Sequence, residues 1–424
     1  MVFASAALGA EEDEATYKQL ELFARVLSYV ENNYVERVDQ QQLVYGAIKG
    51  MLDTLDPHTV FMPPEVFKEM KIDTSGEFGG LGIEVAKKDE VLTVVSPVDD
   101  TPAARAGIRP GDQILQIDQA PTRQMELAEA IQKMRGPAGK KVLLTIMRPG
   151  FQAPREIAII RDHIRIVSVE GALYDGIGHV KVKNFQERTD LYLKKELDRL
   201  RTQNGGQELR GLVLDLRNNP GGLLDQAVAI SDRFLPGNLT VVTTQGRAGR
   251  NTTEEKSRDR DTERSYPVVV LVNAGSASAS EIVAGALQDH SRAVLMGTPT
   301  FGKGSVQTLI ELEDGSGLKL TIARYYTPKG RSIQERGITP DFVVGEGPEK
   351  VESGQQMREK DLAHHFKAEG EAEREGALQQ NLPANLKPWT GSAAVKDHQL
   401  KVALEYLHGS TPQVARARAS ASPP

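Results

Sequence analysis

The stretch VVVLVNAGSASASE, residues 268–281, decides the fold of the central part of this chain. Its first six residues, VVVLVN, predict a buried strand, because a strand covered on both faces has no polar side. The small residues that follow predict a tight turn, after which a helix is expected over residues 280–289. Strand, turn and helix repeat in this way from residue 164 to 345, which predicts an α/β sheet covered by helices.

The turn after this strand contains three serines, Ser276, Ser278 and Ser280. Small neighbouring side chains allow a hydroxyl to project while a substrate backbone passes close by. The amino terminus of the following helix offers free N–H donors to a developing oxyanion. Taken alone, however, the segment is better explained as an ordinary serine-rich helix cap.

A second segment, TFGKGSVQ at residues 300–307, places Lys303 between two glycines. A desolvated lysine loses its charge more easily, and a neutral amine can act as the general base for a serine. Taken alone, the segment is a surface loop. A phosphate-binding loop is rejected, because the glycine that such a motif needs five residues before the lysine is Thr298 here.

The third segment, DLRNNPGGL at residues 215–223, ends the predicted buried strand Gly211–Leu216 and opens a helix over 223–234. Its glycines can direct backbone N–H groups into the crevice at the carboxyl ends of the strands. Alone, it is a turn and a helix cap. Together, the three segments supply a nucleophile, a base and oxyanion donors near one edge of one sheet.

The composition limits the other classes of function. The 424 residues carry a net charge of −6 and contain no cysteine. A charge this close to neutral gives no electrostatic argument for nucleic acid or an anionic membrane. Disulfides, thiolate chemistry and cysteine-based metal sites are excluded. The eight histidines are scattered, so no metal site is expected.

The segments described above, together with RYYTPKGRSIQERGITPD at residues 324–341, resemble the carboxyl-terminal processing peptidases, which are tail-specific serine proteases. The resemblance extends from about residue 14 to 345. It implies a crotonase-like (ClpP/crotonase-type) α/β core and a Ser–Lys endopeptidase that needs no cofactor. In that family pattern Ser278 is the nucleophile and Lys303 the general base, oriented by Gln307 one helical or loop turn later. The implied oxyanion donors are the backbone amides of Gly221 or Gly222 and of Ala279.

Residues 76–163 change character to short strands punctuated by glycine and proline, which fits a small partly open barrel. This part resembles a PDZ domain inserted in the chain. Gly80-Leu81-Gly82-Ile83 is similar to the loop that binds a terminal carboxylate, and residues 96–112 to the turn and helix that follow. Arg135 is similar to the arginine that reports peptide occupancy to the catalytic domain.

The resulting domain prediction has five parts. Residues 1–13 are a signal-peptide remnant or a frayed end, 14–75 a helical dimerisation region, 76–163 a PDZ domain, 164–345 the protease core and 346–424 a polar, largely mobile region with a helix at 398–407.

We expect protein or peptide substrates with exposed carboxyl termini, an adaptor, and a homodimer or larger assembly formed by the N-terminal helices and 398–407. No nucleic acid partner is expected. The family and the first ten residues favour export to the periplasm or cell envelope.

Three alternatives stay open at this stage. The chain could be a non-catalytic PDZ scaffold that binds peptides, or an acyl-CoA enzyme, although no segment supports a CoA-phosphate site. A Ser–His pair is the third. His290 is excluded because it lies at the far end of the helix after Ser278, roughly 18 Å away. His58, His163 and His179 have no sequence support.

Overall fold

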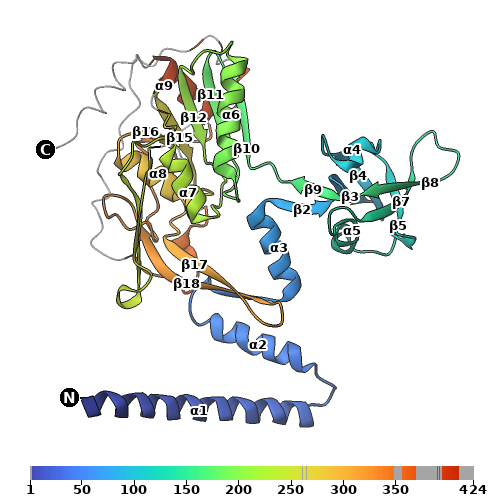
Figure 1. The fold of residues 1–424 in the computed structure, drawn as a ribbon, viewed down its shortest axis with the longest axis vertical. Coiled ribbons are helices and arrows are strands. Elements are labelled where there is room, and N and C mark those ends of the chain that lie inside the picture. The colour runs from blue at the N-terminus through green and yellow to red at the C-terminus, as the bar shows by residue number, and fades with distance from the viewer. Residues whose placement is uncertain are drawn as a thin grey trace.

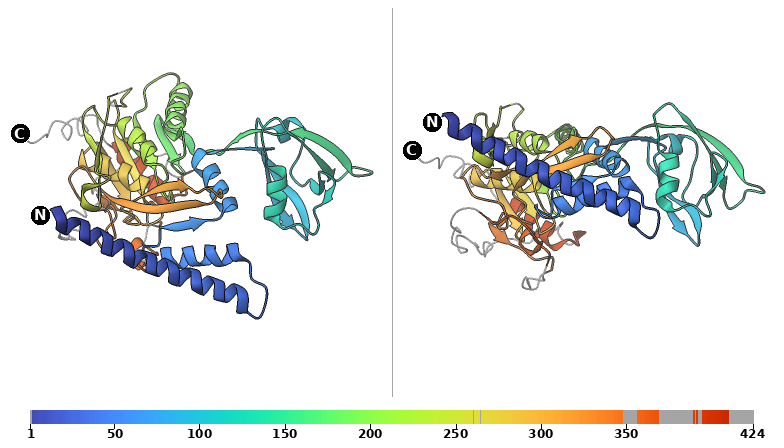
Figure 2. Two further views of the ribbon diagram at one scale, coloured as in Figure 1. Left: turned by 60° about the horizontal axis from the view of Figure 1, so that its bottom comes forward. Right: turned by 90° about the horizontal axis from the view of Figure 1, so that it is seen from below.

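A computed structural model describes residues 2–259, 261–263, 265–347, 356–368, 389, 391 and 394–409, with side chains from residue 17 onward. The molecule has a helical arm, a small β-rich domain and a larger α/β core (Figure 1). Strands β2 (Glu77–Gly80) and β9 (Asp162–Arg165) pair antiparallel and join the small domain to the rest. Figure 2 shows that the small domain stands apart from the core.

A six-stranded sheet lies at the centre of the core. Its order is β10 (Val169–Tyr174), β11 (Ile177–Val182), β12 (Gly211–Asp215), β15 (Val268–Val272), β16 (Ala293–Gly297) and β19 (Phe342–Val343). Strands β10 and β11 are antiparallel, and the other neighbours are parallel. Every residue of β12 and β15 is buried, as their continuous apolar sequences predict.

Helices cover both faces of this sheet (Figure 1). On one face lie α6 (Thr189–Gln203), α7 (Leu224–Asp232) and α8 (Ala279–Asp289), whose apolar side chains join the main core cluster. On the other face lies α9 (His398–Gly409). Alternation along β12 explains this arrangement, because Leu212 and Leu214 face the first layer and Val213 faces the second.

A second sheet packs beside the first and carries part of the site. It has the order β1 (Val60–Met62), β18 (Gly317–Tyr326), β13 (Thr240–Gly246) and β14 (Thr253–Lys256), and β17 (Ser305–Glu311) also pairs with β18. Two expectations are corrected here. The charged stretch 248–265, whose sequence predicts a solvated loop, contains β14, an edge strand whose mostly exposed side chains tolerate charge. Gln307 lies on strand β17, not on a helical or loop turn.

The helical arm consists of α1 (Val2–Asn33), α2 (Gln40–Leu52) and α3 (Pro64–Ser75). Helix α1 runs along the outside of the molecule (Figure 2). Its apolar side chains are exposed, including Leu20 at 57%, Phe23 at 44% and Val26 at 54%. Within the described residues, no helix combines the length and the apolar character needed to cross a bilayer.

The small domain is built from β3 (Ile83–Lys88), β4 (Val91–Pro97), β5 (Gln113–Ile117), β6 (Ala120–Pro121), β7 (Lys141–Met147) and β8 (Arg155–Ile160), with helices α4 (Pro102–Arg105) and α5 (Leu127–Met134). Its strands form one sheet in which β3 is an edge strand. It has its own apolar core, in which Ile114, Leu144 and Ile146 are fully buried.

The polar C-terminal region is more ordered than expected where the structure describes it; residues 348–355, 369–388 and 410–424 lie outside the described residues. Helix α9 buries Leu400, Leu404 and Leu407 against the central sheet of the same chain. Arg217 reinforces this docking through ion pairs of 2.7 Å to both Asp215 and Asp397. The apolar face of residues 398–407 is therefore used within the chain, which corrects its assignment to a dimer contact.

Candidate active site

Three loops meet at the carboxyl edge of the central sheet. They follow β12, β15 and β16, which are neighbouring parallel strands, so their ends lie at the same edge. Backbone hydrogen bonds connect the loops directly: Ala277 N–H donates to Asn219 O at 3.0 Å, and Phe301 N–H donates to Ser276 O at 3.0 Å. The structure thus brings the three predicted segments together.

Ser278 differs from the two serines beside it. The Ser276 hydroxyl is fully buried and donates to Leu216 O at 2.8 Å, and the Ser280 hydroxyl is fully buried and donates to Asn219 O at 2.9 Å. Ser278 is only half-buried and has φ 55° and ψ −114°, a conformation that residues other than glycine rarely adopt. A strained turn that presents a hydroxyl at the start of a helix is typical of a nucleophile.

Glu281 connects this turn to the loop that carries Lys303. Its carboxylate is fully buried and accepts the N–H groups of Ser278 at 2.8 Å, Gly302 at 2.7 Å and Lys303 at 2.9 Å. The Thr300 hydroxyl also donates to it, at 2.5 Å. Burial raises the pKa of Glu281 to about 7, against the opposing effect of these four donors. The carboxylate thereby holds residues 278 and 303 in one rigid unit.

Replacing Glu281 with glutamine is expected to damage both stability and activity. The amide would present N–H groups to two of the four donors and leave them unsatisfied. We expect a loss of about 2–4 kcal/mol in the free energy of unfolding and a fall in kcat of at least about tenfold. Chemical denaturation and steady-state cleavage measure these two effects. Glu129→Gln, at a solvent-exposed position on α5, is the control that should change neither.

Lys303 is half-buried on the loop between β16 and β17. Desolvation, together with the positive charge of Lys319 on β18, lowers the pKa of Lys303 to about 8, against the opposing effects of Glu359, Glu281 and Asp56. An amine with this pKa has a substantial neutral fraction near neutral pH, as a general base requires.

Because Lys319 disfavours the charged form of Lys303, replacing Lys319 with glutamine is expected to raise the pKa of Lys303. The acid limb of the pH–rate profile should then move to higher pH. The profile of kcat/KM measures this shift, with Lys71→Gln at an exposed position as the control. An unmoved limb would show that Lys319 does not influence the base.

Tyr325 completes the immediate surroundings of the serine and the lysine. Its ring is 2% exposed, and its hydroxyl donates to the backbone carbonyl of Lys303. Burial raises the pKa of Tyr325 well above its usual value, and a hydrogen bond with the Ser278 side chain opposes this shift. No direct hydrogen bond between the Ser278 hydroxyl and the Lys303 amine is formed within the described part of the chain. The phenol therefore lies between the two segments.

The glycines of the 215–223 loop lie against Ser278. Gly221 has φ 102°, and a Cβ there would come within 2.8 Å of the Ser278 Cβ. The Gly221 N–H donates to Asn219 Oδ1 at 2.9 Å, so it is already engaged. Gly222, with φ 143°, and Ala279, at the first turn of α8, stay the predicted oxyanion donors.

Gln307 does not contact Lys303 through any hydrogen bond within the described residues. Its side-chain amide donates to the Ser305 hydroxyl at 2.9 Å and to the Thr321 hydroxyl at 3.4 Å. The role of Gln307 in orienting Lys303 stays a prediction. In the structure its side chain is instead hydrogen-bonded to Ser305 at the start of β17.

The small domain offers a strand edge that suits an extended peptide. Among the described strands, β3 pairs with β4 alone, and Ile83 and Val85 of β3 and Leu127 and Ile131 of α5 are partly buried apolar residues. Residues Gly80 to Ile83 enter β3 and are anchored by Thr101, whose hydroxyl donates to Gly82 O at 3.2 Å. Such an edge strand and helix accept a peptide as an added strand.

Arg135 lies at the C-terminal end of α5, and its side chain reaches elements outside the small domain. It forms an ion pair with Glu69 of α3 and stacks over the Phe78 ring at 4.5 Å from its centroid. It therefore connects the small domain to the helical arm.

Comparison with known proteins identifies the family. The model of peptidase family S41 matches residues 176–344, a PDZ domain matches 93–148, and the N-terminal domain of the activating protease CtpB matches 4–66. The chain is 43% identical over 405 residues to a carboxy-terminal-processing protease of Bartonella bacilliformis, covering 95% of this chain and 91% of the relative. The chain belongs to the carboxy-terminal-processing proteases.

Two further proteins are similar to this chain. A carboxyl-terminal-processing protease of Synechocystis is 40% identical over 320 residues, covering 73% of each chain. The solved photosystem II D1 C-terminal processing protease is 29% identical with a TM-score of 0.43, covering 76% of this chain and 92% of that one. This chain is thus a serine-type peptidase with a PDZ domain, and it binds protein or peptide substrates.

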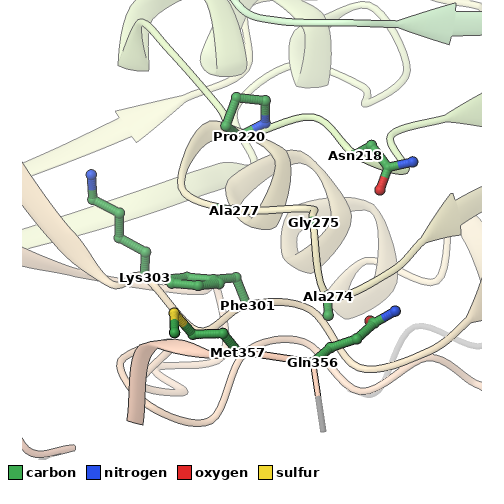
Figure 3. A pocket seen from close by; sticks show the side chains of 9 residues that line it. All are labelled: Asn218, Pro220, Ala274, Gly275, Ala277, Phe301, Lys303, Gln356 and Met357. Atoms are coloured by element: carbon green, nitrogen blue, oxygen red, sulfur yellow. The ribbon is translucent and has the colours of Figure 1, made fainter. Parts of the chain in front are cut away.

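A cavity of about 500 Å³ opens beside the protease site. Figure 3 shows Phe301 and Met357 next to each other, with the Lys303 amine pointing away from them. The lining is mainly apolar; it includes Asn218, Pro220, Ala277, Phe301, Lys303 and Met357. An apolar substrate side chain fits such a pocket.

Two of the histidines considered as catalytic groups are engaged elsewhere. His290 Nε2 lies 2.7 Å from Thr240 O, and His179 Nε2 lies 3.1 Å from the Asp215 carboxylate. Among the described residues, no group of three or more acidic or histidine side chains could hold a metal ion.

Glu281 and Tyr325 are the site residues that sequence reasoning missed. Both stand within the quoted motifs, as the last residue of the serine turn and the second of RYYTPKG.

Proposed function

We propose that the protein is an endopeptidase with a Ser278–Lys303 dyad that acts through an acyl-enzyme. The neutral amine of Lys303 takes the proton of the Ser278 hydroxyl as the oxygen attacks the substrate carbonyl. The same proton then goes to the leaving amine, and water hydrolyses the ester by the reverse sequence. The amides of Gly222 and Ala279 stabilise the oxyanion, with Gly221 as the alternative donor.

One observation carries this proposal. Ser278 has a strained backbone at the start of α8, and Glu281 ties that backbone to the loop of a lysine whose pKa is lowered to about 8. A structural helix cap needs neither the strain nor the desolvated lysine. The dyad requires a small approach of Ser278 and Lys303, which a bound substrate can supply by displacing the contact with Tyr325.

Substrate selection follows from the PDZ groove. We infer that Gly80–Ile83 binds the terminal carboxylate of a protein chain, that β3 pairs with its last residues, and that cleavage occurs nearby. Arg135, through Glu69, passes the occupied state to the rest of the molecule. A crotonase-like core, export to the periplasm or cell envelope, an adaptor, and assembly through the exposed face of α1 belong to the same proposal.

Digestion of casein by the wild type and by Ser278→Ala tests the proposal. We expect the wild type to cleave and the variant to lose at least about a thousandfold in rate, while its circular dichroism spectrum stays native. Ser265→Ala, at an exposed position, is the matched control and should cleave normally. Equal cleavage by Ser278→Ala would exclude this nucleophile, and no cleavage by the wild type would favour a peptide-binding scaffold.

A further inference from the structure

A buried carboxylate near the site takes part in the mechanism described above only through its charge, which opposes the lowering of the Lys303 pKa. Glu359 lies in the C-terminal segment 356–368, and its side chain is fully buried. His58 Nε2 lies 2.8 Å and 3.0 Å from its two carboxylate oxygens. His58 belongs to the turn between α2 and β1, so this contact joins the helical arm to the C-terminal segment.

Glu359 is hydrogen-bonded, directly or through Gln334, to the loop that carries Lys303, on both sides of that residue. On one side, its backbone N–H donates to Phe301 O at 3.1 Å. On the other side, the Gln334 amide donates to its carboxylate at 2.9 Å, and the Gln334 oxygen accepts the N–H of Gly304 at 2.9 Å. Gln334 is 1% exposed, so this chain of contacts is shielded from water.

The turn that carries His58 also reaches β18, the strand that pairs with β17. The buried carboxylate of Asp56 accepts the Thr321 hydroxyl at 3.1 Å, and Thr321 in turn accepts the Gln307 amide. The Thr59 hydroxyl accepts the backbone N–H of Thr321 at 3.1 Å. Residues 56–59 are therefore connected to both ends of the segment that runs from Lys303 to Gln307, through Thr321 at one end and through Glu359 at the other.

We propose that His58 and Glu359 are positioning residues, which together fix the loop 301–304 so that the Lys303 amine can reach the Ser278 hydroxyl. The inference rests on the proposed function, since it concerns the same base. A buried carboxylate needs its partner, and without His58 the Glu359 side chain would turn toward another donor or toward water. A displacement of about 1 Å in the loop is enough to lower the rate strongly.

Steady-state cleavage of casein by four proteins tests this inference: the wild type, His58→Ala, His58→Gln and Lys71→Ala. The glutamine at residue 58 retains an N–H that can donate to Glu359, so it is the conservative rescue. Lys71 of α3 forms a 2.7 Å pair with Glu311 of β17 and also joins the arm to the core, but at the exposed surface. It is the matched control, because exposed pairs contribute little.

We expect His58→Ala to lower kcat at least about tenfold with KM within about twofold. His58→Gln should recover most of kcat, and Lys71→Ala should equal the wild type. A folded His58→Ala with wild-type kcat would overturn the inference, as would a defect in KM alone or no recovery in His58→Gln. If His58→Ala does not fold, the isosteric variant Glu359→Gln is measured in its place. A fall in kcat of at least about tenfold then supports the inference, and wild-type kcat overturns it. Lys303→Met in parallel separates the two proposals, because activity in that variant would refute the dyad itself.

Discussion

Replacing Lys303 with methionine is expected to reduce kcat by at least about a thousandfold. Methionine keeps the length and the apolar part of the side chain but cannot accept a proton. The Ser278 hydroxyl would then have no base, while Glu281, Tyr325 and the glycine loop stay in place. Cleavage of casein under substrate saturation measures this loss.

The same substitution should leave the fold intact or make it more stable. The pKa of Lys303 is lowered to about 8 by desolvation, so the folded state disfavours its charged form at pH 7. Methionine removes that cost. We expect the thermal midpoint of Lys303→Met to equal or exceed that of the wild type, whereas Lys71→Met at the surface should be neutral in both assays. A Lys303→Met variant that loses only about tenfold in kcat or less would contradict the role of the lysine as general base.

The meeting of the three loops was predictable from the sequence for a simple reason. Continuous apolar strands imply a parallel sheet covered on both faces, and the carboxyl ends of its strands share one edge. The apolar runs before Asp215 and Asn273 therefore placed both turns correctly. The choice of Ser278 among three serines came from the family resemblance, and in the structure its two neighbours donate to backbone carbonyls.

Other features could not be predicted because they depend on contacts between distant segments. Glu281 has the sequence position of an ordinary first-turn acid, and only folding brings it to Thr300 and Gly302. His58 and Glu359 are 301 residues apart. Strand β14 was missed because an edge strand is mostly exposed, and its charged sequence carries no apolar alternation.

The C-terminal segment 356–368 shows the same limit. Its sequence is polar, which favours a mobile chain when local composition is the only guide. In the structure its polar groups are used: Arg358 donates to Thr300 O at 3.0 Å and Glu359 is fully buried. Polar side chains with specific partners can order a segment as well as apolar ones, but composition does not identify the partners.

The second large effect is the dependence of cleavage on pH. A general base works in its neutral form, so the rate should rise as the pH passes through the pKa of Lys303, about 8. Below that value, kcat/KM should fall about tenfold for each pH unit. Glu281 has a pKa of about 7, and its protonation weakens the hydrogen bonds that its carboxylate accepts from the backbone amides of Ser278 and Lys303. The fall should therefore steepen further below that pH.

The pH profile of kcat/KM tests most directly whether residue 303 supplies an uncharged amine to the serine. The measurement covers roughly pH 5 to 10, with thermal unfolding at each pH to confirm that the protein stays folded. We predict a plateau above about pH 9 and an acid limb with an apparent pKa near 8 that moves upward in Lys319→Gln. A rate that is constant from about pH 5 to 9 in folded protein would contradict the Ser278–Lys303 dyad.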